Sequence, residues 1–414
     1  MVVYGFLPSA STRNMPAAGE TFAPLKEMDE NFKIMMTGTH PAALPERTMR
    51  EERIDYVCDR EGPQTILKTV LALKSTNPAL SNIPSLWYQD NGRIVSNMPG
   101  ELMDDLENEM PGVAWDLLPM EKYRAHNWHS FERIHERTPY VSLHTSLGCP
   151  YKCSFCCINA PFGKSSYRMW SPDTVIREID LLMKRCGVRN IKFADEMFVL
   201  NRNHVLGICD RIIERGYDLN IWAYARVETV KDEFLDKLNR AGFRWLALGI
   251  ESGSKHVRDG VEKGRFGTTQ ILEVVRKIQD AGINVIGNYI FGLPDDTHES
   301  MQETLELAIE ANCKFANFYS AMAYPGSQLY LLALQKRWAL PDTWIGYSQH
   351  SYETLPPRTE VLSAAEVLKF CDEAFMKYFT DPKYPDMVQR KFGEDVIQHI
   401  RDMTRIKLKR KLHS

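Results

Sequence analysis

From Tyr140 to Ala321 the chain alternates short runs of β-branched or aromatic residues with amphipathic segments of helical spacing. This alternation is typical of strand–helix units arranged around a parallel sheet. The expected strands are 140–145, 191–194, 219–224, 245–250, 285–291 and 315–321, and the expected helices are 172–186, 204–215, 231–241, 270–281 and 297–311. Six such units predict a partial barrel that is open on one side, with its chemistry at the carboxyl ends of the strands.

Two regions of different character flank this predicted barrel, which takes residues 140–325. Residues 1–100 contain expected strands at 2–6, 31–37 and 54–57 and a helix at 65–73, which indicates part of a doubly wound α/β domain. The turn Asp90-Asn91-Gly92 predicts a hairpin. Residues 101–139 are expected to form an irregular linker, and residues 326–414 a mostly helical C-terminal domain. The predicted fold class is therefore α/β.

Three cysteines, Cys149, Cys153 and Cys156, follow the first barrel strand with the spacing Cys-x3-Cys-x2-Cys. A cubane [4Fe-4S] cluster has four irons, so three protein thiolates leave one iron open to a small molecule. A structural zinc site usually takes four ligands in two pairs, and no second pair follows here. His144 is an alternative fourth ligand, whereas Cys157 is expected to point away from its neighbour's site.

The overall composition excludes several classes of partner. Lys and Arg number 51 against 54 Asp and Glu, so the net charge gives no reason to expect nucleic acid. The basic run at 405–412 is interpreted as a solvated helix end, with contact to phosphates or an acidic lipid face as the alternative. The odd count of nine cysteines, clustered only once, argues against a disulfide scaffold and predicts a reducing, cytoplasmic location. Neither an export signal nor a transmembrane helix is expected from the sequence.

The cysteine loop and the predicted barrel, together residues 140–321, resemble the radical S-adenosylmethionine (SAM) superfamily. The stretches 37–46, 54–57, 61–62 and 111–118 further resemble those members whose barrel follows a cobalamin-binding domain. Many such domains carry an Asp-x-His-x-x-Gly loop that ligates cobalt, and this sequence does not contain one. His40 is not a substitute, because it matches a stretch that approaches the nucleotide tail. The resemblance therefore implies a shortened cobalamin-binding-like domain at 1–100, and leaves cobalamin as an open expectation.

The resemblance also implies SAM contacts at matching positions near the strand ends. Phe155 resembles an aromatic residue near the adenine, with core packing as the alternative. Glu196 is expected to accept hydrogen bonds from the SAM ammonium group, with Asp195 as the competing candidate. Arg226 is expected to pair with the SAM carboxylate, with an ion pair to Glu228 as the alternative. The remaining matches, to the ribose, adenine or methionine carboxylate, are Glu251, Ser252, Lys263, Asn288 and Ile290.

The activity implied by the resemblance is reductive cleavage of SAM at a [4Fe-4S] cluster, which yields a 5′-deoxyadenosyl radical that modifies an unactivated carbon. An electron donor such as flavodoxin or ferredoxin is the implied partner. With cobalamin the implied reaction is C-methylation; without it, rearrangement, dehydration and dehydrogenation remain open. The substrate class, whether small molecule, lipid, glycan or peptide, is not indicated.

Two alternative functions are weighed against this one. A methylthio-transferring relative would need three further cluster cysteines, and only Cys58 lies upstream of the motif. A non-catalytic iron–sulfur or zinc-binding interaction module is the alternative of another class.

Three aromatic residues after the barrel either cover its mouth or pack between domains: Trp338, Trp344 and Tyr347.

Overall fold

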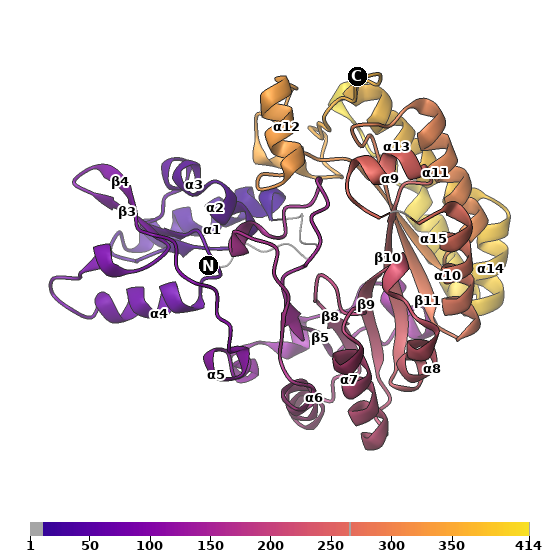
Figure 1. Cartoon of the computed structure of the whole chain (residues 1–414), viewed down its shortest axis with the longest axis horizontal. Helices are drawn as coiled ribbons and strands as arrows, with labels where there is room; N and C mark the ends of the chain where they lie inside the picture. Colours follow the sequence, from indigo (N-terminus) through magenta and orange to yellow (C-terminus); the bar gives the residue numbers. More distant parts are fainter. Residues whose placement is uncertain (1–10, 265, 414) are drawn as a thin grey trace.

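The computed structural model describes residues 11–264 and 266–413, and its centre is a parallel sheet of six strands (Figure 1). In spatial order these are β5 (Tyr140–Leu143), β8 (Asn190–Phe193), β9 (Asn220–Arg226), β10 (Phe243–Glu251), β11 (Asn284–Phe291) and β12 (Phe315–Ser320). Every neighbouring pair is parallel, and β5 and β12 are the two edges. The predicted six-stranded partial barrel is confirmed.

The five helices expected between the strands lie within two residues of their predicted bounds, and a further short helix at 255–260 was not predicted. In the first of the five, the Ser171 hydroxyl accepts a hydrogen bond from the backbone N–H of Thr174, and Gly187 ends the same helix at φ 59°. Figure 1 shows α8, α10 and α11 on the outer side of the sheet, with the N-terminal unit on the opposite side. The connecting helices are α6 (Pro172–Cys186), α7 (Arg202–Arg215), α8 (Asp232–Arg240), α9 (Lys255–Gly260), α10 (Thr268–Asp280) and α11 (His298–Ala311), and α12 (Gln328–Lys336) follows β12.

The segment 101–139, predicted as an irregular linker, is mostly irregular but packs into the barrel core. It holds one short helix, α5 (Leu106–Glu109), and three 3-10 segments, of which the last, Trp128–Arg133, packs against the start of β9. The Trp128 ring lies 5.0 Å from that of Trp222 and 5.7 Å from that of Trp245. The segment is therefore not a free linker. It covers aromatic side chains of the sheet that would otherwise be exposed to water.

The C-terminal region is helical, as predicted, but its buried side chains join the barrel core. It contains α13 (Ala364–Thr380), α14 (Lys383–Phe392) and α15 (Glu394–Arg405). The Tyr378 hydroxyl donates to the carbonyl of Cys313 at 2.6 Å. The basic run that follows is only partly solvated: buried Arg410 pairs with Asp372 through two contacts of 2.7 and 2.9 Å. The prediction of a solvated helix end is therefore wrong for Arg410, which anchors the end of the chain.

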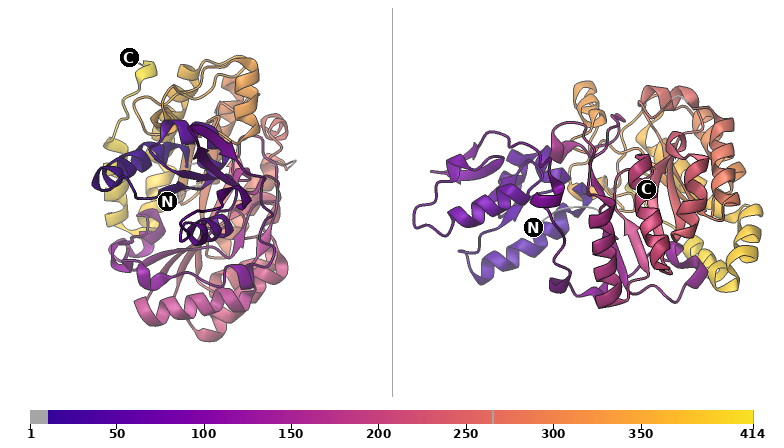
Figure 2. Two further views of the ribbon diagram at one scale, coloured as in Figure 1. Left: turned by 90° about the vertical axis from the view of Figure 1, so that its left-hand side faces the viewer. Right: turned by 60° about the horizontal axis from the view of Figure 1, so that its bottom comes forward.

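The N-terminal unit is a separate sheet of four strands with flanking helices, beside the barrel in Figure 1 and in the right-hand view of Figure 2. Its strands are β1 (Met35–Met36), β2 (Tyr56–Cys58), β3 (Leu86–Asp90) and β4 (Arg93–Ser96), and its helices are α1 (Met15–Met28), α2 (Thr39–Ala43), α3 (Pro45–Glu51) and α4 (Pro63–Ala72). β1 and β2 are parallel, whereas β3 and β4 form the predicted hairpin through Asn91 and Gly92, both with positive φ. The strand expected at 2–6 lies outside the described residues.

The two units meet through aromatic residues of the segment that follows α12. Trp344 lies 4.5 Å from the ring of His40 and under the guanidinium of Arg47 at 4.0 Å. Tyr347 is buried beside Tyr324 and Cys157. Trp344 thus packs between the two units, whereas Trp338 packs against an apolar cluster of α12 and the barrel that includes Val257 and Leu329. Among the described residues, no helix has the length and apolarity needed to cross a membrane.

Replacing Phe131 with Ala tests the packing of the segment 101–139. Phe131 is 1% exposed and packs against Trp245, Phe315 and Phe392. We expect the substitution to lower the free energy of unfolding by about 3–5 kcal/mol. Leu117→Ala in the same segment, where Leu117 is 78% exposed, is the control and should change it by less than about 0.5 kcal/mol. Urea denaturation followed by circular dichroism measures both, and equal small losses would contradict the packing described.

His129 makes the stability of this region depend on pH. Its Nε2–H donates to the Asn220 carbonyl at 2.9 Å, and burial lowers the pKa of its imidazole to about 3. Between pH 7 and pH 5 the unfolded chain therefore binds a proton that the folded chain does not, and the free energy of unfolding falls by about 2 kcal/mol through this group. His129→Gln should remove that part of the pH dependence in urea denaturation at the two pH values. An identical slope in both proteins would refute the assignment.

Candidate functional site

The cysteine loop starts at a position that only glycine can occupy. Gly148 has φ +84°, and a Cβ there would lie 2.6 Å from the Ser166 carbonyl oxygen. The base of the loop is closed by β6 (Ser146–Leu147), which pairs antiparallel with β7 (Arg168–Met169). The backbone therefore folds back directly before Cys149 and holds the loop over the carboxyl end of β5.

An ion pair to the N-terminal unit fixes the far side of this loop. Arg168, the register partner of Leu147, donates to Glu61 at 2.6 Å, and the two side chains are only 10% and 8% exposed. Glu61 also accepts from the backbone N–H of Met103 at 2.8 Å, and Arg168 donates to the Met103 carbonyl at 2.6 Å. Because neither charge can move without leaving the other buried and unpaired, the two units hold the loop in one position.

Backbone hydrogen bonds tie the middle of the loop to the barrel rim. The N–H of Cys156 donates to the Cys153 carbonyl at 3.0 Å, which forms a turn between the two cysteines. Ser154 donates to the Val261 carbonyl and accepts from the N–H of Leu329, at 3.1 and 2.8 Å. The loop is thus fixed between the segment after α9 and the start of α12.

The three thiols of the loop lie close enough to influence one another. Burial raises the pKa of Cys149, and the neighbouring charges of Cys153 and Glu196 raise it further. Burial also raises the pKa of Cys156 well above its ordinary value, and the neighbouring charges of Cys157, Cys153 and Cys149 raise it further. Iron would have to displace these thiol protons, as metals do at thiolate sites generally.

The donor set fits an iron–sulfur cluster better than a single metal ion. Within the described ranges, no three His, Cys, Asp or Glu side chains converge on one point as ligands of one ion. A cubane cluster does not need this, because each thiolate binds a different iron. Arg226 also donates to the Cys153 sulfur at 3.2 Å, a contact of the kind that supports metal-bound thiolates.

Two further residues beside this loop, Cys157 and His144, have surroundings that differ from those of the three cysteines. Cys157 is buried in a cluster with Met322, Tyr324 and Tyr347, and burial raises the pKa of its thiol to about 12. His144 lies near Lys192, and burial lowers the pKa of its imidazole to about 4.

Asp195 joins the ends of β5 and β8 beneath the loop. Its carboxylate accepts hydrogen bonds from the Thr145 N–H at 2.6 Å, the Thr145 hydroxyl at 2.5 Å and the Ser146 hydroxyl at 2.7 Å. Asp195 is completely buried, so its carboxylate is occupied by these hydrogen bonds within the protein. Of the two acidic candidates for the SAM ammonium group, the half-buried Glu196 is the one that lies beside Cys149.

A buried ion pair lies at the carboxyl end of β10. Lys263 contacts Glu251 at 2.7 Å, and Glu251 has the left-handed φ of +67°, which is rare for residues other than glycine. A Cβ on Gly249 would lie 2.5 Å from the Lys263 ammonium and 2.6 Å from the Glu251 carboxylate. The strand end is therefore shaped around this pair, and such strain is concentrated at functional sites.

The remaining predicted positions divide into two groups. Asn288 accepts from Asn317 at 2.9 Å and donates to the Leu248 carbonyl at 3.1 Å, and Phe155 and Ile290 pack against one apolar cluster beneath α12. Ser252, in contrast, is completely buried and its hydroxyl bonds Thr304 of α11 at 3.1 Å. The structure therefore does not bring Ser252 to the other residues.

Two polar residues of the site were missed by the sequence analysis. The Tyr151 ring lies 3.8 Å from the Arg226 guanidinium. Lys192, buried in the barrel interior, lies 4.8 Å from the Trp222 ring and 5.7 Å from the Tyr224 ring, and burial lowers its pKa to about 7. A lysine inside a short buried strand was the signal that could have indicated it.

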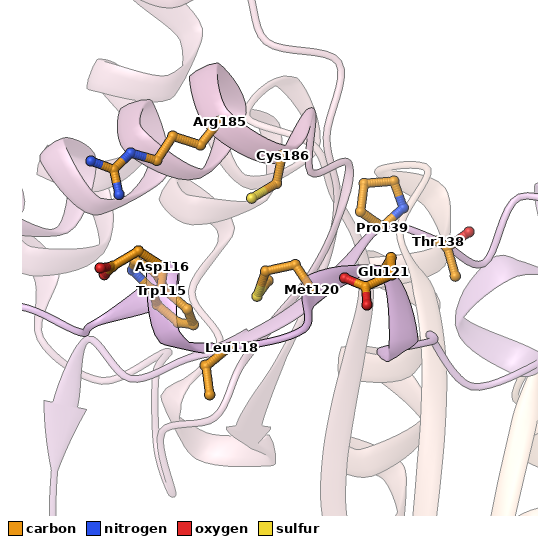
Figure 3. Close-up of a pocket in the computed structure, with 9 residues that line it drawn as sticks. All are labelled: Trp115, Asp116, Leu118, Met120, Glu121, Thr138, Pro139, Arg185 and Cys186. Carbon is orange, nitrogen blue, oxygen red and sulfur yellow. The ribbon is translucent and has the colours of Figure 1, made fainter.

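A pocket of about 510 Å³ lies at the opposite end of the barrel (Figure 3). Its lining includes Pro139, directly before β5, and Cys186, the last residue of α6. This pocket therefore lies at the amino-terminal ends of the strands and is remote from the cysteine loop. The catalytic sites of such barrels lie at the carboxyl ends.

Comparison with known proteins agrees with this geometry. Residues 143–308 match the Radical SAM superfamily. An uncharacterized methyltransferase of Pyrococcus horikoshii is 30% identical over 378 residues, which cover 91% of this chain and 78% of that protein. The anaerobic magnesium-protoporphyrin IX monomethyl ester cyclase of Cereibacter sphaeroides is 25% identical over 367 residues, which cover 87% of this chain and 57% of the cyclase.

A solved structure shares the fold. The radical S-adenosylmethionine methyltransferase TsrM from Kitasatospora setae, solved with cobalamin and a [4Fe-4S] cluster bound, has a TM-score of 0.62 and 18% identity. The match covers 81% of this chain and 62% of TsrM. The chain thus spans less than two thirds of the length of TsrM and of the cyclase.

Replacing Asp195 with Asn tests the support of the loop. The amide leaves at least one of the three donors without an acceptor in a dry site, which costs about 1–3 kcal/mol. We expect a lower free energy of unfolding and less iron bound per chain after anaerobic reconstitution. Asp180→Asn, at a half-buried carboxylate paired with Arg215, is the control and should keep the iron content. Full iron binding by Asp195→Asn would show that the loop does not depend on this carboxylate.

Proposed function

Because the chain belongs to the radical SAM superfamily, whose members use a [4Fe-4S] cluster and SAM, we propose that Cys149, Cys153 and Cys156 hold that cluster here. The observation that supports this proposal is a loop, fixed by backbone hydrogen bonds, that holds three neighbouring thiols at the carboxyl end of the first strand. When bound and reduced, the cluster supplies one electron to the SAM sulfonium, which releases methionine and a 5′-deoxyadenosyl radical.

The chain's own residues would bind and orient SAM at the neighbouring strand ends. Glu196, beside Cys149, would accept hydrogen bonds from the ammonium group. Lys263 and Arg226 would hold the carboxylate. Asn288 and Glu251 would bind the nucleoside hydroxyls, and Phe155 and Ile290 would shield the adenine from water beneath α12.

We further propose that the reaction is C-methylation with cobalamin as second cofactor. Names of related proteins include methyltransferases, among them the hopanoid C-2 methylase of Rhodopseudomonas palustris. In this chain, β1 and β2 end close to Gly38 and Gly62, and α2, which follows β1, packs against residues 160–162 of the cysteine-loop region. Ligands of doubly wound sheets bind at such strand ends. A corrin bound there would lie next to the barrel mouth, where a methyl group could reach the substrate radical.

Reductive SAM cleavage is the direct test of the first proposal. After anaerobic reconstitution with iron and sulfide, we expect dithionite and SAM to give 5′-deoxyadenosine, measured by liquid chromatography and mass spectrometry. The triple variant Cys149→Ala, Cys153→Ala, Cys156→Ala should give none, because no iron ligand remains in the loop. Cys157→Ala, which removes the adjacent thiol that packs in the cluster with Met322, Tyr324 and Tyr347, should retain cleavage. Undiminished cleavage by the triple variant would contradict the assignment.

Cobalamin binding is tested separately by equilibrium dialysis of the reconstituted protein with hydroxocobalamin. We expect retention of the corrin, with a visible spectrum of the bound form, that does not depend on the three cysteines. Absence of retention by protein that still cleaves SAM would contradict methylation and favour rearrangement, dehydration or dehydrogenation.

A further inference from the structure

Arg226 makes three contacts that together direct its guanidinium at the cysteine loop. One Nη donates to the Cys153 sulfur at 3.2 Å. Its Nε donates to Glu228 at 2.6 Å. The Tyr151 ring lies 3.8 Å from its central carbon. The Arg226 side chain is 3% exposed and that of Glu228 is 30% exposed, so the guanidinium itself is shielded from water.

From this geometry we infer that Arg226 sets the reduction potential of the cluster through its hydrogen bond to the Cys153 sulfur, with Glu228 and Tyr151 as positioning residues. The inference rests on the proposed cluster ligands. It adds a role that is distinct from SAM binding, because the Nη that donates to sulfur is fixed in the absence of any ligand.

The sign of the effect follows from charge. One-electron reduction by an external reductant such as dithionite makes the cluster and its thiolates more negative. A cation that donates a hydrogen bond to a ligand sulfur stabilises the reduced form more than the oxidised form, and thereby raises the midpoint potential. The low exposure of the Arg226 side chain strengthens its electrostatic interaction with the Cys153 sulfur, because little water screens it.

The double variant Arg226→Gln, Glu228→Gln isolates the hydrogen bond from net charge, since it removes one positive and one negative charge together. Its midpoint potential is measured by anaerobic redox titration with electron paramagnetic resonance detection, without SAM. We expect the equilibrium to shift about tenfold toward the oxidised cluster, which is about 59 mV for a one-electron couple. Arg226→Lys, which keeps the charge but not the planar fork, should show a smaller shift in the same direction.

Lys152→Gln is the matched control, because it removes an exposed charge next to Cys153 without removing a contact to sulfur. Water and salt screen exposed charges, so its midpoint should stay close to that of the unmodified protein. An unchanged midpoint in the double variant, or an equal shift in Lys152→Gln, overturns the inference even if the protein binds a four-iron cluster and cleaves SAM. A protein that assembles no such cluster overturns the proposed function, and this inference with it.

Discussion

The hydrogen bonds of Asp195 to Thr145 and Ser146 are the constraint on which the site depends. They join the carboxyl ends of β5 and β8 at the point where the chain leaves the sheet and enters the cysteine loop. Burial raises the pKa of this carboxyl group, while the hydrogen bonds from Thr145 and Ser146 act in the opposite direction. A buried carboxylate in a satisfied network gives a rigid origin for the loop, and the left-handed turn at Gly148 then sets its direction.

The N-terminal unit completes this support from the other side. The buried ion pair between Glu61 and Arg168 connects its sheet to the strand that closes the loop, and the contacts of Trp344 with His40 and Arg47 hold the two units together near the barrel mouth. The unit therefore has a structural role whether or not it binds a corrin. Its parallel strand ends lie toward the loop, which is why a second cofactor is proposed there.

The barrel could be predicted from the sequence because its signals are local. The period of apolar residues, the N-cap at Ser171 and the glycine at 187 each act within one turn of helix. The packing of Trp128 and Phe131 into the barrel could not be predicted, because the segment has no periodic pattern and its partners lie about 90 to 260 residues away. The same reason explains why residues 101–139 were interpreted as a linker.

The candidate site was predictable in part. Order and spacing placed Glu196, Arg226, Glu251 and Lys263 at strand ends, but the sequence could not show that Asp195 is used internally or that Ser252 faces α11. Those outcomes depend on the direction in which each side chain points at the end of its strand. The irregularity of β10 between Gly249 and Glu251 changes the alternation of side chains between the two faces of the sheet. The ion pair of Arg226 with Glu228 was the alternative expected from the sequence, whereas its contact with Cys153 joins residues that are 73 positions apart.

The central claim is that three thiolates hold a four-iron cluster and leave one iron for SAM. Mössbauer spectroscopy of protein reconstituted with ⁵⁷Fe tests it most directly, because each iron contributes its own signal. The account predicts that SAM changes the signal of one iron in four and leaves the other three unaltered. Four irons that do not respond to SAM, or iron that is not in a four-iron cluster, would contradict it.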